Sequence, residues 1–310
     1  MSRASLTSGD VIADRRYEYA RAYAAADDFA AALDLYAQVR ELTPEWLPAM
    51  LGEADCLIEL GRGEEAAPIL ARMVELDPDG LFGAELKLAA LGLAAAPAAP
   101  PTAYVKGLFD SYADKFDKAL VGDLGYRTPW HLADRLALLD PKRTYGSVLD
   151  LGCGTGLMAE ALGDLASGLV GCDLSPGMLA KARVRGRYQR LIEADVVAAL
   201  DGEAGPFDLI TAADVFVYVG RLEATFAGVV KRLAPGGLFA FSVEAAEEGD
   251  GVQLRDSLRY AHGEGYVRAL AAAAGLDIRV FDTAPLRLDR GKAIKGYLVL
   301  ARHGNKAANP

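Results

Sequence analysis

The sequence is poor in the residues that build disulfide, metal and membrane-spanning structures. Its 310 residues include three histidines and three cysteines, and Cys56, Cys153 and Cys172 form no CxxC or Cys/His cluster. This excludes a disulfide framework, predicts no metal site and fits a reducing cytoplasm. Apolar runs stop at a charge or a proline well before the ~20 residues that a membrane span needs. We therefore expect a cytoplasmic protein with no signal peptide and no membrane association.

Basic residues are also in short supply. Lys and Arg number 33 against 43 Asp and Glu, which gives a formal net charge of -10. Such a field repels phosphate backbones, so nucleic acid is not expected as a partner, and the basic run at 181–190 is interpreted as a solvated helix face. The chain is 52% hydrophobic, which is enough for a substantial core in two domains.

The N-terminal third contains an internal repeat of 34 residues. The pairs that share this offset are Pro44 and Pro78, Ala20 and Ala54, Ala32 and Ala66, Tyr36 and Leu70, and Leu42 and Leu76. Period and residue types resemble tetratricopeptide repeats, although the tryptophan and glycine positions of the first helix are not matched. We predict a small all-α domain at 10–93 with a capping helix at 81–93, followed by a Pro/Ala linker at 94–101.

Two functions are open for this repeat domain. It is either a peptide-binding groove or a packing and dimerisation module, and the second is favoured because two repeats offer little concave surface. A protein partner or a homodimer through this domain is therefore part of the hypothesis.

Short β-branched runs alternate with helical patterns from residue 145 onward. The expected strands are 146–151, 168–173, 188–195, 207–215, 236–244, 276–283 and 296–302, and the expected helices are 155–165, 175–185, 221–232 and 264–274. Alternation of this kind predicts an α/β Rossmann-like fold, with a seven-stranded, mostly parallel sheet that binds ligands at the carboxyl ends of its strands.

The stretch VLDLGCGTG, residues 148–156, falls at such a strand end. Gly152, Gly154 and Gly156 alternate after Asp150, a pattern that differs from the GxGxxG of NAD-binding proteins by its spacing and by the acidic residue before it. An NAD-dependent dehydrogenase is therefore the less favoured interpretation. The glycines let a ligand approach the backbone closely.

This motif resembles that of the class I S-adenosylmethionine-dependent methyltransferases. The resemblance implies that the three glycines and Asp150 face the amino-acid end of the cofactor, that Asp173 binds its ribose, and that Asp195 binds its adenine amino group. It further implies that Leu174 and Met178 line the adenine face and that Asp214 contacts the cofactor tail or the acceptor. The methyltransferase domain is expected at 102–303.

Residues 102–140 resemble the lid helices that precede the first motif in this family. The segments FDSYADKFD and GYRTP make Tyr112 and Arg127 candidates for holding the cofactor carboxylate, while the alternative is that the aromatic residues only pack the lid onto the sheet.

The catalytic group is harder to place, because methyl transfer needs a base only when the nucleophile carries a proton. His262, in the connection after the fifth expected strand, is the candidate, with a solvated loop histidine as the alternative. The resemblance implies S-adenosylmethionine as methyl donor, S-adenosylhomocysteine as product, and a small-molecule or peptide acceptor. The alternative function is a non-catalytic cofactor sensor and peptide-binding adaptor.

Overall fold

The protein divides into two compact units, Met1–Pro97 and Ala98–Pro310. The computed structural model describes residues 7–112, 125–203, 205–247, 249–289 and 291–304. The boundary between the units lies inside the Pro/Ala tract at 94–101. Within the described residues, no helix is both long enough and apolar enough to cross a bilayer.

The described part of the first unit, from residue 7 onward, contains five helices. They are α1 (Val11–Ala25), α2 (Phe29–Leu42), α3 (Leu47–Glu59), α4 (Gly63–Leu76) and the short α5 (Ala84–Ala90). Consecutive helices pack against each other, and the repeated alanines Ala20, Ala32, Ala54 and Ala66 are fully buried in these contacts. Small side chains let the helix backbones approach closely. A β-carbon at Gly52 of α3 would meet the Tyr36 ring of α2 at 2.3 Å.

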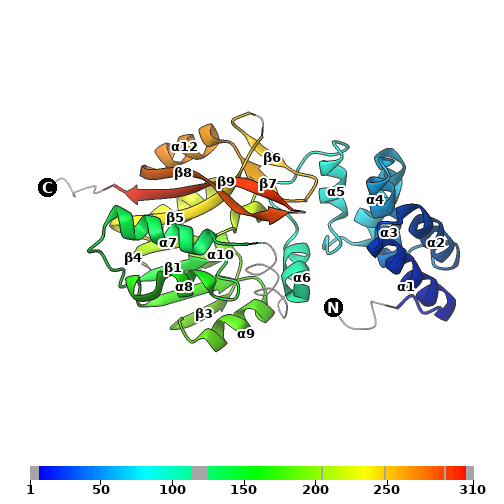
Figure 1. Cartoon of the computed structure of the whole chain (residues 1–310), viewed down its shortest axis with the longest axis horizontal. Coiled ribbons are helices and arrows are strands. Elements are labelled where there is room, and N and C mark those ends of the chain that lie inside the picture. Colours follow the sequence, from blue (N-terminus) through cyan, green and yellow to red (C-terminus); the bar gives the residue numbers. More distant parts are fainter. Residues whose placement is uncertain (1–6, 113–124, 204, 248, 290, 305–310) are drawn as a thin grey trace. The chain divides into compact units, whose positions relative to one another are not determined.

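The second unit is built on one mixed sheet (Figure 1). Its strands are β1 (Val148–Leu151), β2 (Leu169–Asp173), β3 (Arg190–Glu193), β4 (Phe207–Ala212), β5 (Leu233–Ala245), β6 (Val252–Leu254), β7 (Tyr260–His262), β8 (Leu276–Asp289) and β9 (Lys292–His303). The parallel strands run in the order β3-β2-β1-β4-β5, and β9 pairs antiparallel with both β5 and β8. All seven expected strands form, so the predicted fold class is confirmed; β6 and β7 are two further short strands.

Helices pack on both faces of this sheet. The helices described in this unit are α6 (Thr102–Tyr112), α7 (Thr128–Leu139), α8 (Leu157–Leu162), α9 (Pro176–Arg185), α10 (Val196–Gly202), α11 (Glu223–Arg232) and α12 (Glu264–Ala273), with 3-10 turns at Gly163–Leu165 and Phe216–Tyr218. Of these, α6 packs against α9. One core cluster joins α7 and α8 to the sheet, and a second joins α10, α11 and α12 to its other side. The order of the strands reverses between β1 and β4, and such a reversal leaves a crevice at the carboxyl ends of the strands.

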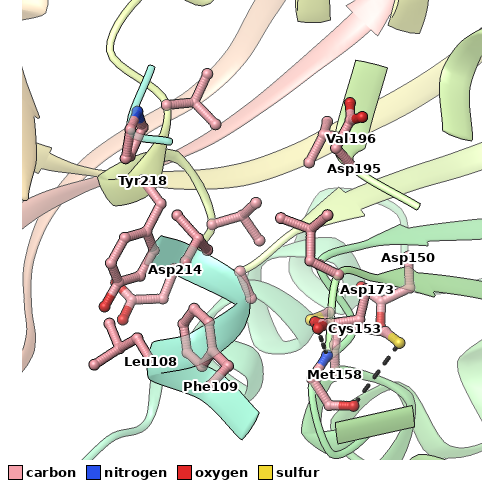
Figure 2. A pocket seen from close by; sticks show the side chains of 18 of the residues that line it. Leu108, Phe109, Asp150, Cys153, Met158, Asp173, Asp195, Val196, Asp214 and Tyr218 are labelled. Carbon is pink, nitrogen blue, oxygen red and sulfur yellow. Dashed lines mark hydrogen bonds between the residues drawn. The ribbon is translucent and has the colours of Figure 1, made fainter. Parts of the chain in front are cut away.

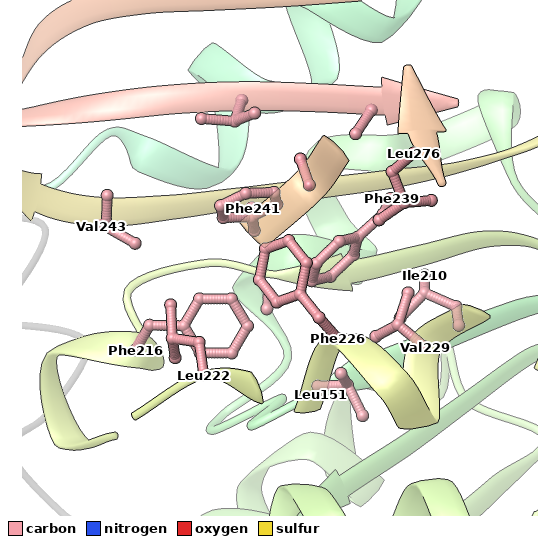
Figure 3. Close-up of a cluster of buried hydrophobic side chains, with 14 of the residues drawn as sticks. Leu151, Ile210, Phe216, Leu222, Phe226, Val229, Phe239, Phe241, Val243 and Leu276 are labelled. Atoms are coloured by element: carbon pink, nitrogen blue, oxygen red, sulfur yellow. The ribbon is translucent and has the colours of Figure 1, made fainter. Parts of the chain in front are cut away.

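Four phenylalanines with their rings in mutual contact lie in the second core cluster (Figure 3). Phe239 and Phe241 are two residues apart on β5, so their side chains share one face of the sheet, and their ring centroids lie 4.5 Å apart. Phe226 of α11 meets both rings edge-on, and Phe216 lies beside them. This packing fixes α11, β5 and the turn after β4 relative to one another, and that turn carries part of the site described next.

Candidate functional site

A cavity of about 590 Å³ opens at the carboxyl ends of β1, β2 and β4 (Figure 2). Seven of the predicted site residues line it, namely Asp150, Gly152, Gly154, Asp173, Leu174, Asp195 and Asp214. Four others do not, namely Gly156, Met178, Arg127 and His262. Tyr112 ends α6, and its side chain lies outside the described residues. Within the described residues, no group of three or more His, Cys, Asp or Glu side chains could hold a metal ion.

The three glycines of the β1 loop serve different purposes. All have positive φ, +58° at Gly152, +54° at Gly154 and +95° at Gly156. A β-carbon at Gly152 would meet Val215 at 2.6 Å, and one at Gly156 would meet Tyr188 at 3.2 Å, so protein side chains press on these two positions. A β-carbon at Gly154 would meet nothing within 4 Å. The free space beside the loop backbone therefore lies at Gly154, on the cavity wall.

Asp173, at the end of β2, connects this loop to the cavity. Its two carboxylate oxygens accept hydrogen bonds from the N–H groups of Gly154 at 2.9 Å and Ser175 at 2.8 Å. Burial raises the pKa of this carboxyl, and the backbone hydrogen bonds from Ser175 and Gly154 act in the opposite direction. A carboxylate accepts more than one hydrogen bond on each oxygen, so Asp173 still has capacity for a ligand that enters the cavity.

Asp150, in β1, is almost entirely buried. Thr211 donates a hydrogen bond to one of its oxygens and Tyr188 to the other, each at 2.6 Å. Burial raises the pKa of Asp150 to about 6, and the two hydroxyl donors partly oppose this shift. At neutral pH the group is therefore a carboxylate beneath the glycine loop, in a position to favour a positive charge nearby.

We expect the free energy of unfolding to depend on pH because the Asp150 carboxyl titrates at a different pH in the folded and unfolded chain. Its pKa in the folded chain, about 6, exceeds its usual value of 3.8, so its contribution to stability is present below the lower value and is lost as the pH rises through the higher one. Urea unfolding from about pH 4.5 to about pH 7.5 should show wild-type stability falling by about 2 kcal/mol relative to Asp150→Asn. Exposed Asp164→Asn is the control and should follow the wild type; parallel curves for Asp150→Asn would contradict the assignment.

Of the residues predicted to lie beside the adenine, Leu174 and Asp195 line the cavity and Met178 does not. Met178 is fully buried in α9, and Met158 of α8 supplies a thioether on the wall instead. Asp195 caps α10, because one oxygen accepts the N–H groups of Val197 and Ala198 at 2.9 Å. Since Asp195 also lines the cavity, its helix-capping role and a contact with a ligand are compatible.

Asp214 follows β4 with a φ of +60°, a rare conformation for a residue other than glycine. Nη1 of Arg287 donates to both of its carboxylate oxygens at 2.8 Å. Nη2 of Arg287 contacts Glu244 of β5, and both side chains are almost completely buried. Arg287 could not be predicted from the sequence, because its partners Asp214 and Glu244 are 73 and 43 residues away in the chain. Only the pairing of β5, β9 and β8 brings them together.

Helix α6 forms one wall of the cavity. Leu108 and Phe109 face the space in Figure 2, and the Phe109 ring lies edge-on to Tyr218 with centroids 5.1 Å apart. The hydroxyl of Ser175 donates to Asp110 at 2.5 Å, which fastens α6 to the start of α9. Arg127 is exposed at the start of α7, with its guanidinium carbon 5.7 Å from the centre of the Trp130 ring.

His262 lies in β7, is fully buried and is not among the residues that line the cavity. Its Nε2 lies 2.9 Å from the carbonyl oxygen of Gly220 and 3.1 Å from that of Val219, so this nitrogen carries the proton and donates. Burial lowers the pKa of the ring, with the backbone contacts opposing the shift. The ring is therefore neutral and holds β7 to the segment after β4, a structural position rather than one facing a substrate.

Two family models match the chain. Residues 149–239 match the model described as Methyltransferase domain, and residues 23–91 match the model described as Tetratricopeptide repeat. The first match spans the strand ends that build the cavity, and the second begins at the end of α1 and covers α2 to α5.

The curated relatives are similar over part of their length. A malonyl-[acyl-carrier protein] O-methyltransferase of Salmonella typhimurium is 34% identical over 112 residues, 36% of this chain and 44% of the relative. A trans-aconitate 2-methyltransferase of Methylobacterium nodulans is 34% identical over 151 residues, 48% of this chain and 55% of the relative. The chain thus spans about half the length of these relatives.

Solved structures share the fold at lower identity. A Burkholderia thailandensis 1,6-didemethyltoxoflavin-N1-methyltransferase with bound S-adenosylhomocysteine aligns with a TM-score of 0.51 at 22% identity, covering 68% of this chain and 94% of that chain. The [4+2]-cyclase SpnF aligns with a TM-score of 0.52 at 18% identity, covering 67% of this chain and 98% of that chain. A cyclase among them shows that the fold alone does not determine the reaction. The sequence matches and the fold agree: the chain contains a methyltransferase domain, with a tetratricopeptide-repeat segment before it.

Proposed function

We propose that this protein transfers a methyl group from S-adenosylmethionine to an oxygen of a small-molecule acceptor held in the cavity. The observation that carries the proposal is the joint position of Gly154 and Asp173. Asp173 holds the loop N–H of Gly154 and lines the cavity, and the space beside Gly154 is free of protein.

The cavity residues fit the chemistry of this cofactor. Its ribose hydroxyls are donors that suit Asp173, and its adenine amino group is a donor that suits Asp195. Its ammonium and sulfonium groups are positive, and Asp150 supplies a buried carboxylate beneath the loop. Asp150, Asp173 and Asp195, the three acidic side chains assigned to the cofactor, would repel a pyrophosphate, which argues against a dinucleotide.

The protein has a limited task in such a reaction. When bound, the cofactor supplies an activated methyl group whose departure leaves a neutral thioether. The chain aligns the acceptor with that group and excludes water. The apolar wall made by Leu108, Phe109, Met158 and Val215 is suited to the second task.

The names of the relatives support an oxygen acceptor. The malonyl-[acyl-carrier protein] and ubiquinone-biosynthesis relatives are both described as O-methyltransferases. The match to the methyltransferase-domain model covers residues 149–239 and ends before β8, which carries Arg287. The residues of the cavity beyond that match are thus where this chain can differ from other methyltransferases.

A pair of glycine substitutions tests where the cofactor binds. Gly154→Ala adds a methyl group to the free space and should weaken S-adenosylhomocysteine binding by at least about tenfold, because the ligand then meets a side chain. Gly186→Ala is the matched control, since Gly186 also has positive φ, +66°, with nothing within 4 Å, but lies at the exposed end of α9.

Both variants should lose similar stability, about 1 kcal/mol, from the left-handed conformation alone. Calorimetric titration should show the affinity loss only for Gly154→Ala. Equal affinities for the two variants would place the cofactor elsewhere.

A further inference from the structure

We propose that the acceptor is a carboxylate anion bound by Arg259, so that the reaction is the methyl esterification of a small carboxylic acid. This inference rests on the proposed function, because it assigns the other half of the same cavity. It depends on three features of the described residues: the distribution of charge, an arginine without an acidic partner, and the lack of a base.

Charge is divided across the cavity. Asp150, Asp173 and Asp195 lie toward one side of the view in Figure 2, and Asp214 and Tyr218 lie toward the other. Arg259 and Arg287 also line the cavity and are its two basic side chains among the residues described. Because Arg287 contacts Asp214 and Arg259 contacts Tyr218, the positive charges belong to the side of Asp214 and Tyr218.

The charge of Arg287 is already balanced. Both oxygens of Asp214 accept from it, and Glu244 is its second acidic partner. The other oxygen of Glu244 lies 3.6 Å from Arg255. Two arginines thus share two carboxylates, and this buried group is neutral as a whole.

Arg259 is the remaining positive charge. Its Nε donates to the hydroxyl of Tyr218 at 3.3 Å, and its guanidinium carbon lies 6.0 Å from the centre of that ring. Among the residues that the structure describes, no carboxylate forms an ion pair with it. A half-buried guanidinium on a cavity wall has donors to spare, and a carboxylate is the anion that matches their geometry.

Asp150, Asp173 and Asp195 are assigned to the cofactor, and no other side chain on the described walls is suited to accept a proton from the acceptor. The lining residues include no histidine or lysine, and Asp214 has both oxygens engaged by Arg287. Burial raises the pKa of the Cys153 thiol and of the Tyr126 hydroxyl well above their usual values, so neither is ionised at neutral pH. An acceptor that arrives as an anion needs no base.

A carboxylate meets this condition. An oxygen lone pair attacks the methyl carbon, the carbon–sulfur bond breaks, and its electron pair stays on sulfur. The products are a neutral methyl ester and S-adenosylhomocysteine, and no proton moves. The negative acceptor and the positive sulfonium neutralise each other, a change that a water-poor cavity favours.

The test uses the full chain, S-adenosylmethionine labelled in its methyl group, and a small-molecule extract of cells. Methyl esters release labelled methanol in alkali, whereas methyl ethers and methylamines do not. We expect most of the transferred label to be released. Label that stays with the product in alkali, or an extract that accepts no label, would overturn the esterification.

Arg259→Gln should reduce label transfer by about 10- to 100-fold while leaving the affinity for S-adenosylhomocysteine unchanged. The control is Arg221→Gln, which removes an exposed guanidinium near the same segment and should transfer label at the wild-type rate. Unchanged transfer by Arg259→Gln would overturn its role. If the wild type itself fails to bind S-adenosylhomocysteine, the proposed function fails, and the two failures are thereby distinguished.

Discussion

Replacing Asp173 with alanine is expected to weaken S-adenosylhomocysteine binding by about 100-fold or more, because one carboxylate serves both the loop and the ligand. The substitution removes the acceptor for the N–H groups of Gly154 and Ser175. It also removes the group that we assign to the two ribose hydroxyls. Calorimetric titration at constant salt measures the loss directly.

Ser175→Ala is the control for the loop part of this effect. It removes the hydroxyl that contacts Asp110 and caps Met178, but leaves the Asp173 carboxylate and the backbone N–H of Ser175 in place. We expect a loss of stability of about 1 kcal/mol from the missing cap and less than a tenfold change in affinity. If Asp173→Ala bound no worse than Ser175→Ala, the ribose assignment would be incorrect.

The second large effect concerns stability. Arg287→Met should reduce the free energy of unfolding by about 3–5 kcal/mol, because it leaves the carboxylate of Asp214 without its cation and leaves the buried Glu244 with only Arg255, 3.6 Å away. Arg287 and Glu244 have side chains only 1% exposed, so solvent cannot replace the lost partner. Urea unfolding followed by far-UV circular dichroism gives the free-energy difference.

Arg279→Met, in the same strand, is the matched control. Arg279 pairs with Asp277 at 3.0 Å, but its side chain is 45% exposed, so we expect a change below about 1 kcal/mol. Adding Glu244→Gln to Arg287→Met should recover part of the loss, since one buried charge is then removed. If Arg287→Met and Arg279→Met lost the same free energy of unfolding, the ion pairs of Arg287 with Asp214 and Glu244 would not be shielded from water, contrary to the structure.

Local patterns were enough to predict the sheet and the cofactor side of the cavity. Gly154, Asp173 and Asp214 stand at or just after the carboxyl ends of β1, β2 and β4. They could therefore be assigned to one edge of the sheet from the sequence alone. Helix α10 was missed because it has only seven residues and no extended periodicity. Met178 was assigned to the ligand from its place in the motif, yet the turn of α9 directs it into the core.

The acceptor side could not be predicted in the same way. Arg287, Glu244 and Asp214 come from three separate segments, and their contact depends on β9 returning between β5 and β8. His262 was predicted to be catalytic because it is an imidazole that follows β5 in the sequence, but the pairing of β7 with β5 buries it. The domain limits, and a partner or homodimer contact through residues 10–93, stay predictions.

Calorimetric titration of the full chain with S-adenosylhomocysteine, and in parallel with NAD, determines which of the two cofactors the cavity binds. The cavity carboxylates predict one binding site for S-adenosylhomocysteine, lost in Asp173→Ala, and no measurable heat with NAD. Absence of heat with S-adenosylhomocysteine, or saturable binding of NAD in its place, would contradict the account.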